Sequence, residues 1–250
     1  MFPDGARIEA GEPMEPEVTV ILGVGPGLSA AVAERFAAAG HALALLSRSA
    51  RHHRALAATI RTRGATAQGY DCDAADPASI AAAFARIRNT LGHPTGLIYT
   101  AGSYMPGGIL ELDGQRFETA WRVNCLGAFL AAREVLPAML QRECGRLLFT
   151  GATASRRGSA GFAGLAVGKF GLRALAQSLA HEFGPRGIHV AHCVIDGQID
   201  SPALHERQPG RAAATCLNPH AVAEAYWQVY RQPPSAWTLE LDLRPHLERF

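Results

Sequence analysis

A short apolar run followed at once by a glycine-rich turn constrains this chain more than any other feature. Residues 18–22 read VTVIL and are apolar apart from Thr19, and the turn GVGPGLS follows at residues 23–29. Leu28, Val32 and Phe36 then recur every four residues, which indicates the buried stripe of a helix. We therefore expect a strand, a tight turn and a helix at the start of the folded part, because glycine permits such a turn.

Strand and helix patterns alternate along the rest of the chain. We expect further strands near residues 42–46, 65–70, 96–99, 146–150, 188–195 and 238–243, two long helices near 116–141 and 161–183, and a polar loop at 203–218. Alternation of this kind predicts right-handed βαβ units. The expected fold class is α/β: a Rossmann-like, doubly wound parallel sheet of about seven strands with helices on both faces.

The length of 250 residues suits one such domain. We assign it to residues 17–250. Residues 1–16 are rich in Pro, Gly and Glu, and we expect a flexible leader outside the fold.

Composition excludes several classes of function. The formal net charge is +2 with scattered basic residues, so we expect no nucleic-acid partner. No uninterrupted apolar run reaches about 18 residues and no signal-peptide pattern precedes residue 16, so we expect no membrane partner. The cysteines number five and none has CxxC spacing, which favours a reducing, cytoplasmic location without disulfides.

The ten histidines show no metal-binding pattern. His189 and His192 fall on opposite faces of a predicted strand and cannot chelate one ion together. His52 and His53 are expected on the solvated face of a helix. We therefore expect no metal site.

The glycine-rich turn suits a pyrophosphate. Gly23, Gly25 and Gly27 let the backbone approach an anion closely, and the helix that begins near Leu28 offers its N-terminal N–H groups. An ordinary turn is the alternative. The position between a first strand and a helix is the context that a dinucleotide-binding fingerprint requires, so we favour a bound cofactor.

The end of the second strand indicates which dinucleotide binds. NAD-binding proteins carry an acidic residue there for the ribose 2′-OH, whereas this chain has Ser47-Arg48. A guanidinium can hold a 2′-phosphate by paired hydrogen bonds. The predicted cofactor is NADP(H), with Arg48 on the phosphate and Arg51 and Arg54 on a solvated helix.

These motifs resemble the short-chain dehydrogenase/reductase family. Gly23 and Gly27 match the first two glycines of its TGxxxGxG turn, while Leu22 replaces the usual Thr and Ser29 the last Gly. The resemblance runs from about residue 17 to about residue 243. It implies cofactor contacts from further positions in the later turns: Asp73 near adenine, Ala101 and Gly102 after the fourth strand, and Gly197, Ile199 and Ser201 after the sixth.

The family's catalytic row is only half present. Asn124 and Lys169 match its Asn and Lys, and the resemblance implies that they hold a water relay and the nicotinamide ribose. The family's proton-donating Tyr, four residues before the Lys, is Leu165 here, and its substrate-orienting Ser is Ala152. We read the chain as a divergent member that lacks both. Tyr104, after the fourth strand, is our candidate for a substitute donor.

Alternatives exist for each of these residues. Asn124 could serve to bend its helix, Lys169 could extend its charge to solvent, and Tyr104 could cover apolar surface in a loop. Thr150, Thr153 or Ser155 could supply a hydroxyl near Ala152. Phe162 holds the position seven before the Lys, where some relatives carry a Tyr, and it has no hydroxyl.

Two functions remain open. The first is an NADP(H)-dependent oxidoreductase that reduces a carbonyl or activated alkene, a small molecule, with a non-standard proton donor. The second is an NADPH-binding relative that regulates or scaffolds a partner protein. We expect a homodimer or homotetramer, because the helix at 162–183 carries small residues that permit close helix contact: Ala163, Ala166, Ala174 and Ala180.

Overall fold

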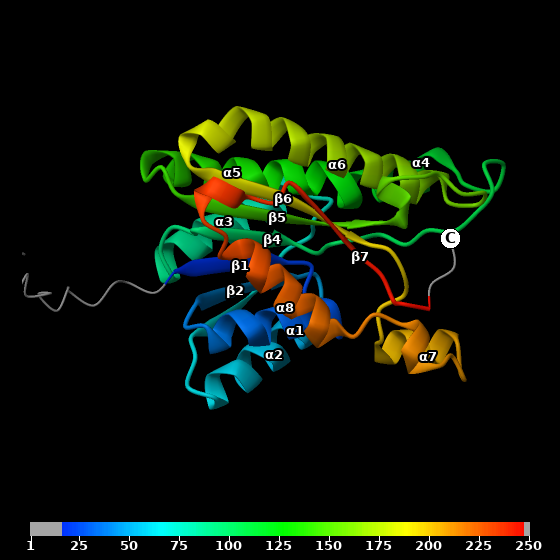
Figure 1. Cartoon of the computed structure of the whole chain (residues 1–250), viewed down its shortest axis with the longest axis horizontal. Coiled ribbons are helices and arrows are strands. Elements are labelled where there is room, and N and C mark those ends of the chain that lie inside the picture. The colour runs from blue at the N-terminus through cyan, green and yellow to red at the C-terminus, as the bar shows by residue number, and fades with distance from the viewer. Residues whose placement is uncertain (1–16, 248–250) are drawn as a thin grey trace, which may run out of the picture.

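The computed structural model describes residues 17–247 and shows a parallel sheet of seven strands between two layers of helices (Figure 1). The strand order is β3-β2-β1-β4-β5-β6-β7. This confirms the predicted Rossmann-like α/β fold. The predicted leader at 1–16 lies outside the described residues.

The elements have the following bounds. The strands are β1 (Val18–Leu22), β2 (Ala42–Ser47), β3 (Ala67–Asp71), β4 (Gly96–Tyr99), β5 (Gly145–Ala152), β6 (Ile188–Ile195) and β7 (Glu240–Leu243). The α-helices are α1 (Leu28–Ala38), α2 (Ala50–Thr62), α3 (Pro77–Thr90), α4 (Gly114–Trp121), α5 (Gly127–Gln141), α6 (Ala163–Phe183), α7 (Pro202–Arg207) and α8 (Pro219–Tyr230). The strands β4 and β6 have the predicted bounds, while β3 and β7 each begin two residues later than expected.

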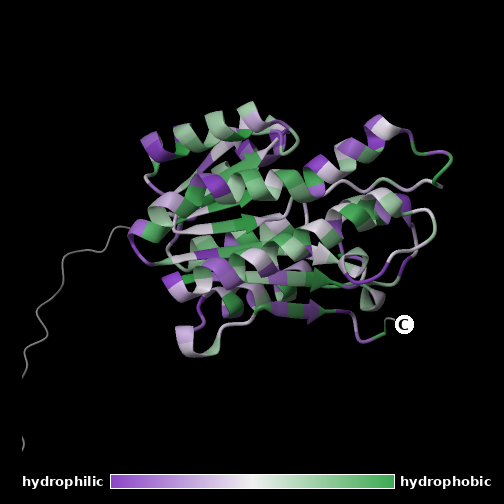
Figure 2. Ribbon diagram, turned by 90° about the horizontal axis from the view of Figure 1, so that it is seen from above, coloured by the Kyte–Doolittle hydropathy of each residue, from purple (hydrophilic) through white to green (hydrophobic). Residues whose placement is uncertain are grey.

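The core lies on both faces of the sheet because successive strand residues point to opposite sides. In β1, Val20 and Leu22 pack with the layer of α3, α5 and α6, whereas Ile21 packs with the layer of α1, α2 and α8. Figure 2 shows mostly hydrophobic strands between helices in which hydrophobic and hydrophilic residues alternate. The sheet is therefore a rigid platform whose strand ends can carry a site.

The long helix predicted near 116–141 is interrupted. A π-helical turn, Arg122–Leu126, joins α4 to α5 and contains Asn124. The combined stretch Gly114–Gln141 is long and apolar enough to cross a membrane, and half of its most apolar window is buried inside the molecule. A core helix passes the same test. Our expectation counted uninterrupted apolar residues, and the charged pair Arg133-Glu134 breaks this run.

Two local predictions were wrong. His53 is buried rather than solvated: it lies on α2 against Gly69, its Nδ1 is 3.2 Å from Ser47 Oγ, and burial lowers its pKa. The segment 203–218, predicted as a loop, contains most of α7. Ser201 caps this helix by accepting a hydrogen bond from Leu204 N, and Pro202 starts it, as both residue types favour.

Candidate active site

A cleft lies at the carboxyl ends of the central strands. The strand order reverses between β1 and β4, and open α/β sheets bind ligands at such a switch point. Two adjoining cavities of about 760 and 480 Å³ share Gly23 and Thr100. The larger cavity extends over β5 and β6, and the smaller one extends over β2 and β3.

Each glycine of the turn after β1 meets a different steric demand. A Cβ on Gly23 would lie 2.2 Å from Ala101 N, and its φ of 110° disfavours other residues. Gly27 has φ 111°, and a Cβ there would lie 3.3 Å from Ser201 Cβ. A Cβ on Gly25 would meet nothing within 4 Å, so the cleft is open at this point. The turn therefore has no room for a side chain at Gly23, whereas the space beside Gly25 is accessible to a ligand.

Ser29, the departure from the family's last glycine, is part of the turn. Its Oγ accepts a hydrogen bond from Gly25 N at 2.8 Å and donates to Gly25 O at 3.0 Å. The serine side chain therefore fixes Gly25 from the first turn of α1, the helix that begins at Leu28.

The smaller cavity collects residues that were predicted to contact the cofactor. Its lining includes five of them: Ser47, Arg48, Asp73, Ala101 and Gly102. Arg48 is exposed at the end of β2. Asp73 is the only carboxylate in this lining, and its Oδ1 accepts from Ala75 N at 2.9 Å. The residue types present fit a phosphorylated ribose, since a cation and no acid lies where β2 ends.

The sequence prediction did not include Ser49 and His52, which also line this cavity. His52 is exposed on α2, as expected, and it lines the cavity together with Arg48. Its position in the first turn of α2, directly after the strand end that carries Arg48, was the available signal.

Asn124 lies beneath the cleft and anchors the loop after β4. Its Nδ2 donates to Ala120 O at 2.9 Å and to Ser103 O at 3.1 Å, and its Oδ1 accepts from Ser103 N at 3.2 Å. The side chain therefore replaces a helical hydrogen bond at the π turn and holds the residue next to Tyr104. These contacts describe a positioning role, and the proton-relay role stays a prediction.

Lys169 is buried on α6 and is 5% exposed. Its Nζ donates to Thr150 O at 2.7 Å, and burial lowers its pKa to about 8. A Cβ on Gly102 would lie 3.6 Å from Asn124 Oδ1 and 3.9 Å from Lys169 Nζ, so the three predicted residues converge. The ammonium does not extend to solvent, which was the alternative interpretation.

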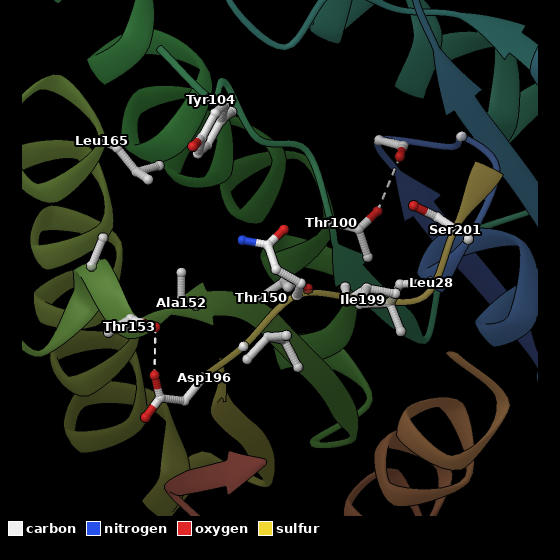
Figure 3. Close-up of a pocket in the computed structure, with 18 of the residues that line it drawn as sticks. Leu28, Thr100, Tyr104, Thr150, Ala152, Thr153, Leu165, Asp196, Ile199 and Ser201 are labelled. Atoms are coloured by element: carbon white, nitrogen blue, oxygen red, sulfur yellow. Dashed lines mark hydrogen bonds between the residues drawn. The ribbon is translucent and has the colours of Figure 1, made fainter. Parts of the chain in front are cut away.

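The larger cavity has an apolar wall at the position where the resemblance implied a tyrosine. Leu165 lines it from the start of α6, and Ala152 lines it from the end of β5 (Figure 3). Phe162, which precedes α6, also lines the cavity. Neither Leu165 nor Ala152 carries a hydroxyl. The cavity also contains the predicted residues Gly23, Gly25, Gly27, Leu28, Gly197, Ile199 and Ser201.

Tyr104 lines the same cavity and is its only phenol within the described residues. It is 57% exposed, and its ring centroid lies 5.7 Å from that of Phe162. The guanidinium carbon of Arg207 lies 5.7 Å from the Tyr104 ring centroid. The loop tyrosine therefore faces the cleft, so its predicted role as a proton donor is geometrically open.

The hydroxyls near Ala152 are held by other groups. Thr153 Oγ1 donates to Asp196 Oδ1 at 2.5 Å (Figure 3). Ser155 Oγ is buried and accepts from Ala152 N, and Thr150 Oγ1 accepts from Tyr226 OH at 2.9 Å. Of these three hydroxyls, that of Thr153 donates its proton to a carboxylate, whereas those of Thr150 and Ser155 accept hydrogen bonds. Tyr104 presents a phenol to the same cavity.

Comparison with known proteins identifies the fold's relatives. The family model described as "short chain dehydrogenase" matches residues 17–212. The short-chain reductase protein NovJ of Streptomyces niveus is 32% identical over 189 residues, which cover 76% of this chain and 71% of NovJ. The 3-oxoacyl-[acyl-carrier-protein] reductase FabG of Salmonella typhimurium is 27% identical over 75% of each chain.

Solved structures of other proteins have the same fold as this chain. A short-chain dehydrogenase from Rhodopseudomonas palustris is 35% identical, with a TM-score of 0.80 over 92% of this chain and 99% of that one. An alcohol dehydrogenase from Thermococcus sibiricus, complexed with 5-hydroxy-NADP, has a TM-score of 0.85 over 94% and 99% of the two chains at 24% identity, a likeness of fold alone.

Proposed function

Because the chain belongs to the short-chain dehydrogenase family, we propose that it is an NADP(H)-dependent reductase of a carbonyl or an activated alkene. The cofactor supplies the hydride. The observation that carries the cofactor choice is the smaller cavity, where Arg48 stands at the end of β2 without an acidic neighbour in that position. NovJ and FabG are named as reductases, which supports the direction of the reaction.

The chain's own residues account for cofactor placement. The turn at 23–29 cradles the pyrophosphate, because Gly25 leaves open space beside the N-terminus of α1. Lys169 Nζ donates to Thr150 O below the cleft and has further N–H donors for the ribose, and its charge favours the phosphate-rich ligand. Asn124 keeps the loop after β4 in register, so that Gly102 leaves room above Lys169.

The proton donor is non-standard in this proposal. Leu165 and Ala152 give the cleft an apolar wall in place of the tyrosine and serine of the family row. Tyr104 gives the proton to the oxygen or carbon that becomes electron-rich as hydride arrives. A phenol is a neutral donor at physiological pH, and general-acid help typically contributes about 10²–10⁴-fold to a rate.

A titration tests the cofactor choice. NADPH quenching of intrinsic fluorescence should give a lower Kd than NADH, since only NADPH carries the phosphate that Arg48 binds. Arg48→Asp should reverse that order. The matched control is Arg54→Asp, an exposed change on α2 outside the cavity lining, which should leave the preference intact. Equal affinity of the unmodified protein for both cofactors refutes the proposal.

Two observations favour a second function. The hydroxyls of Thr150, Thr153 and Ser155 all take part in hydrogen bonds within the protein. Leu165 occupies the position of the family's tyrosine. A protein that binds NADPH and regulates a partner requires no proton donor. The two functions differ in turnover, not in cofactor binding, so only a search for NADPH oxidation with a broad carbonyl and enone panel separates them.

The proposal includes a homodimer or homotetramer in the cytoplasm. Large apolar side chains are exposed on α4, α5 and α6: Trp121, Phe129, Val167 and Phe170. Of the small residues that suggested close contact, Ala166 is buried within the subunit, whereas Ala174 is exposed. The helix pair therefore offers an apolar face that a second copy would cover.

A further inference from the structure

We propose that the larger cavity takes a substrate with an anionic group, a carboxylate or a phosphate, and that Arg157, Arg207 and Arg211 bind it. This inference rests on the proposed function, because it names the substrate class of the same cleft. All three arginines line the cavity that also contains Ala152 and Leu165.

The arginines come from two segments that flank the cavity. Arg157 lies between the end of β5 and the start of α6, in the stretch that leads to Phe162. Arg207 ends α7, and Arg211 follows it by four residues. Two separate segments thus place cations on one cavity, which a solvated helix face does not do.

The charge of the cavity is unbalanced. Asp196 is the only carboxylate in its lining, and this carboxylate already accepts from Thr153. Within residues 17–247, none of the three arginines has an ion pair with an acidic residue. Arg156 differs, since it pairs with Asp242 and does not line the cavity. The adjacent residues Arg156 and Arg157 therefore differ in role, because the first forms an ion pair and the second lines the cavity.

Two hydrogen bonds hold the guanidinium of Arg211, but its Nε–H donor has no acceptor. Its Nη1 donates to Gln208 Oε1 at 3.1 Å and its Nη2 to Thr215 O at 3.4 Å, whereas its buried Nε has no partner. Arg207 donates from Nε to Ala203 O at 3.1 Å. Further N–H donors remain on both side chains, and a planar fork of this kind matches a carboxylate or phosphate.

The rest of the cavity defines the other end of the substrate. Phe162, Leu165 and Ile195 present apolar surface, and the Tyr104 ring lies between Phe162 and the Arg207 guanidinium at 5.7 Å from each. A compound with an apolar body around its carbonyl and a charged tail would fit both the apolar region and the arginine region of the cavity. The three arginines would fix the tail and orient the carbonyl beside Tyr104.

The cofactor's own pyrophosphate is the competing anion, because Gly25 and Gly27 line the same cavity. The experiment therefore measures cofactor affinity separately. The Kd of NADPH comes first from a fluorescence titration. Acetoacetate and dihydroxyacetone phosphate are then titrated by calorimetry into the protein saturated with NADP⁺, against their neutral counterparts ethyl acetoacetate and dihydroxyacetone.

We expect one of the two anions to bind at least about tenfold more tightly than its neutral counterpart, since charge-assisted hydrogen bonds are the stronger ones. The better anion identifies the carboxylate or the phosphate. Arg157→Gln, Arg207→Gln and Arg211→Gln should each reduce this preference, while Arg156→Gln, the control, keeps it. The NADPH Kd should change less than twofold in all four variants.

Two results overturn the inference. If the neutral compounds bind as tightly as the anions, the inference is refuted directly. A loss of NADPH affinity in the three variants, without a change in the preference for anions, assigns the arginines to the cofactor instead. Absence of NADPH binding in the first titration refutes the proposed function, and calorimetry on the cofactor-free protein then still tests the arginines.

Discussion

Replacing Lys169 by methionine should stabilise the cofactor-free protein while it weakens NADPH binding. Lys169 is the single lysine of the chain, and it is buried with its pKa lowered to about 8 from 10.5. That difference corresponds to about 3 kcal/mol against the charged form. Methionine has a similar length and no charge to desolvate.

The net gain is smaller than the full penalty. The variant loses the hydrogen bond from Nζ to Thr150 O, worth about 1.5–3 kcal/mol because the donor is charged. We therefore expect a stabilisation of up to about 1.5 kcal/mol at pH 7. In a domain of this size each kcal/mol shifts Tm by about 2–4 °C, so Tm should rise by up to about 6 °C.

The pH dependence gives the sign of the effect. The folded-state pKa lies below the unfolded one, so the unfolded chain binds the extra proton between pH 8 and 10.5. The free-energy penalty of burying the charged amine of Lys169 is fully present below about pH 8 and is relieved as the pH rises toward 10.5. The advantage of Lys169→Met over the unmodified protein should therefore shrink across this range.

Thermal denaturation of the cofactor-free protein, followed by circular dichroism between pH 7 and 10, measures the difference. Arg186→Met is the control, since Arg186 is exposed before β6 and its loss should leave Tm nearly unchanged. The reasoning fails if Lys169→Met lowers Tm at pH 7, or if its advantage does not narrow with pH. Carbon-13 reductive methylation offers an independent check, because one lysine gives one side-chain signal to titrate.

Three further changes test other parts of the structure. Gly23→Ala should cost about 1–3 kcal/mol or more in chemical denaturation, because its Cβ would lie 2.2 Å from Ala101 N, whereas Gly25→Ala, with open space, should affect NADPH affinity only. Phe170→Asp should give a monomer by light scattering, and Leu110→Asp, an exposed change in the loop before α4, should not. Tyr104→Phe should lower turnover of a substrate by about 10²–10⁴-fold, and unchanged kcat excludes it as the donor.

The sequence was sufficient for the elements whose pattern is local. β4 and β6 were predicted with their observed bounds, because each is a mostly apolar run bounded by turn residues. The π-helical turn at Arg122–Leu126 was not predicted, since one extra residue per turn barely alters a hydrophobic stripe. Its i→i+5 backbone hydrogen bonds form only in the folded helix.

Tertiary contacts explain the remaining differences. His53 was predicted on a solvated helix face together with its neighbour His52. Its burial depends on Gly69 in β3, where a Cβ would lie 2.3 Å from His53 Cδ2. Likewise Arg157 and Arg211 lie 54 positions apart in numbering and meet at one cavity only after β6 and α7 are placed. No local pattern contains such information.

Transfer of deuterium tests the central claim most directly. The protein would be incubated with NADPH that carries deuterium at the transferable C4 position and with a panel of carbonyls and enones, both anionic and neutral, and products would be analysed by mass spectrometry. The account predicts one deuterium on the former carbonyl carbon, or on the β-carbon of an enone, in at least one anionic compound. Tight NADPH binding with no deuterium in any product contradicts the reductase and supports a cofactor-binding protein.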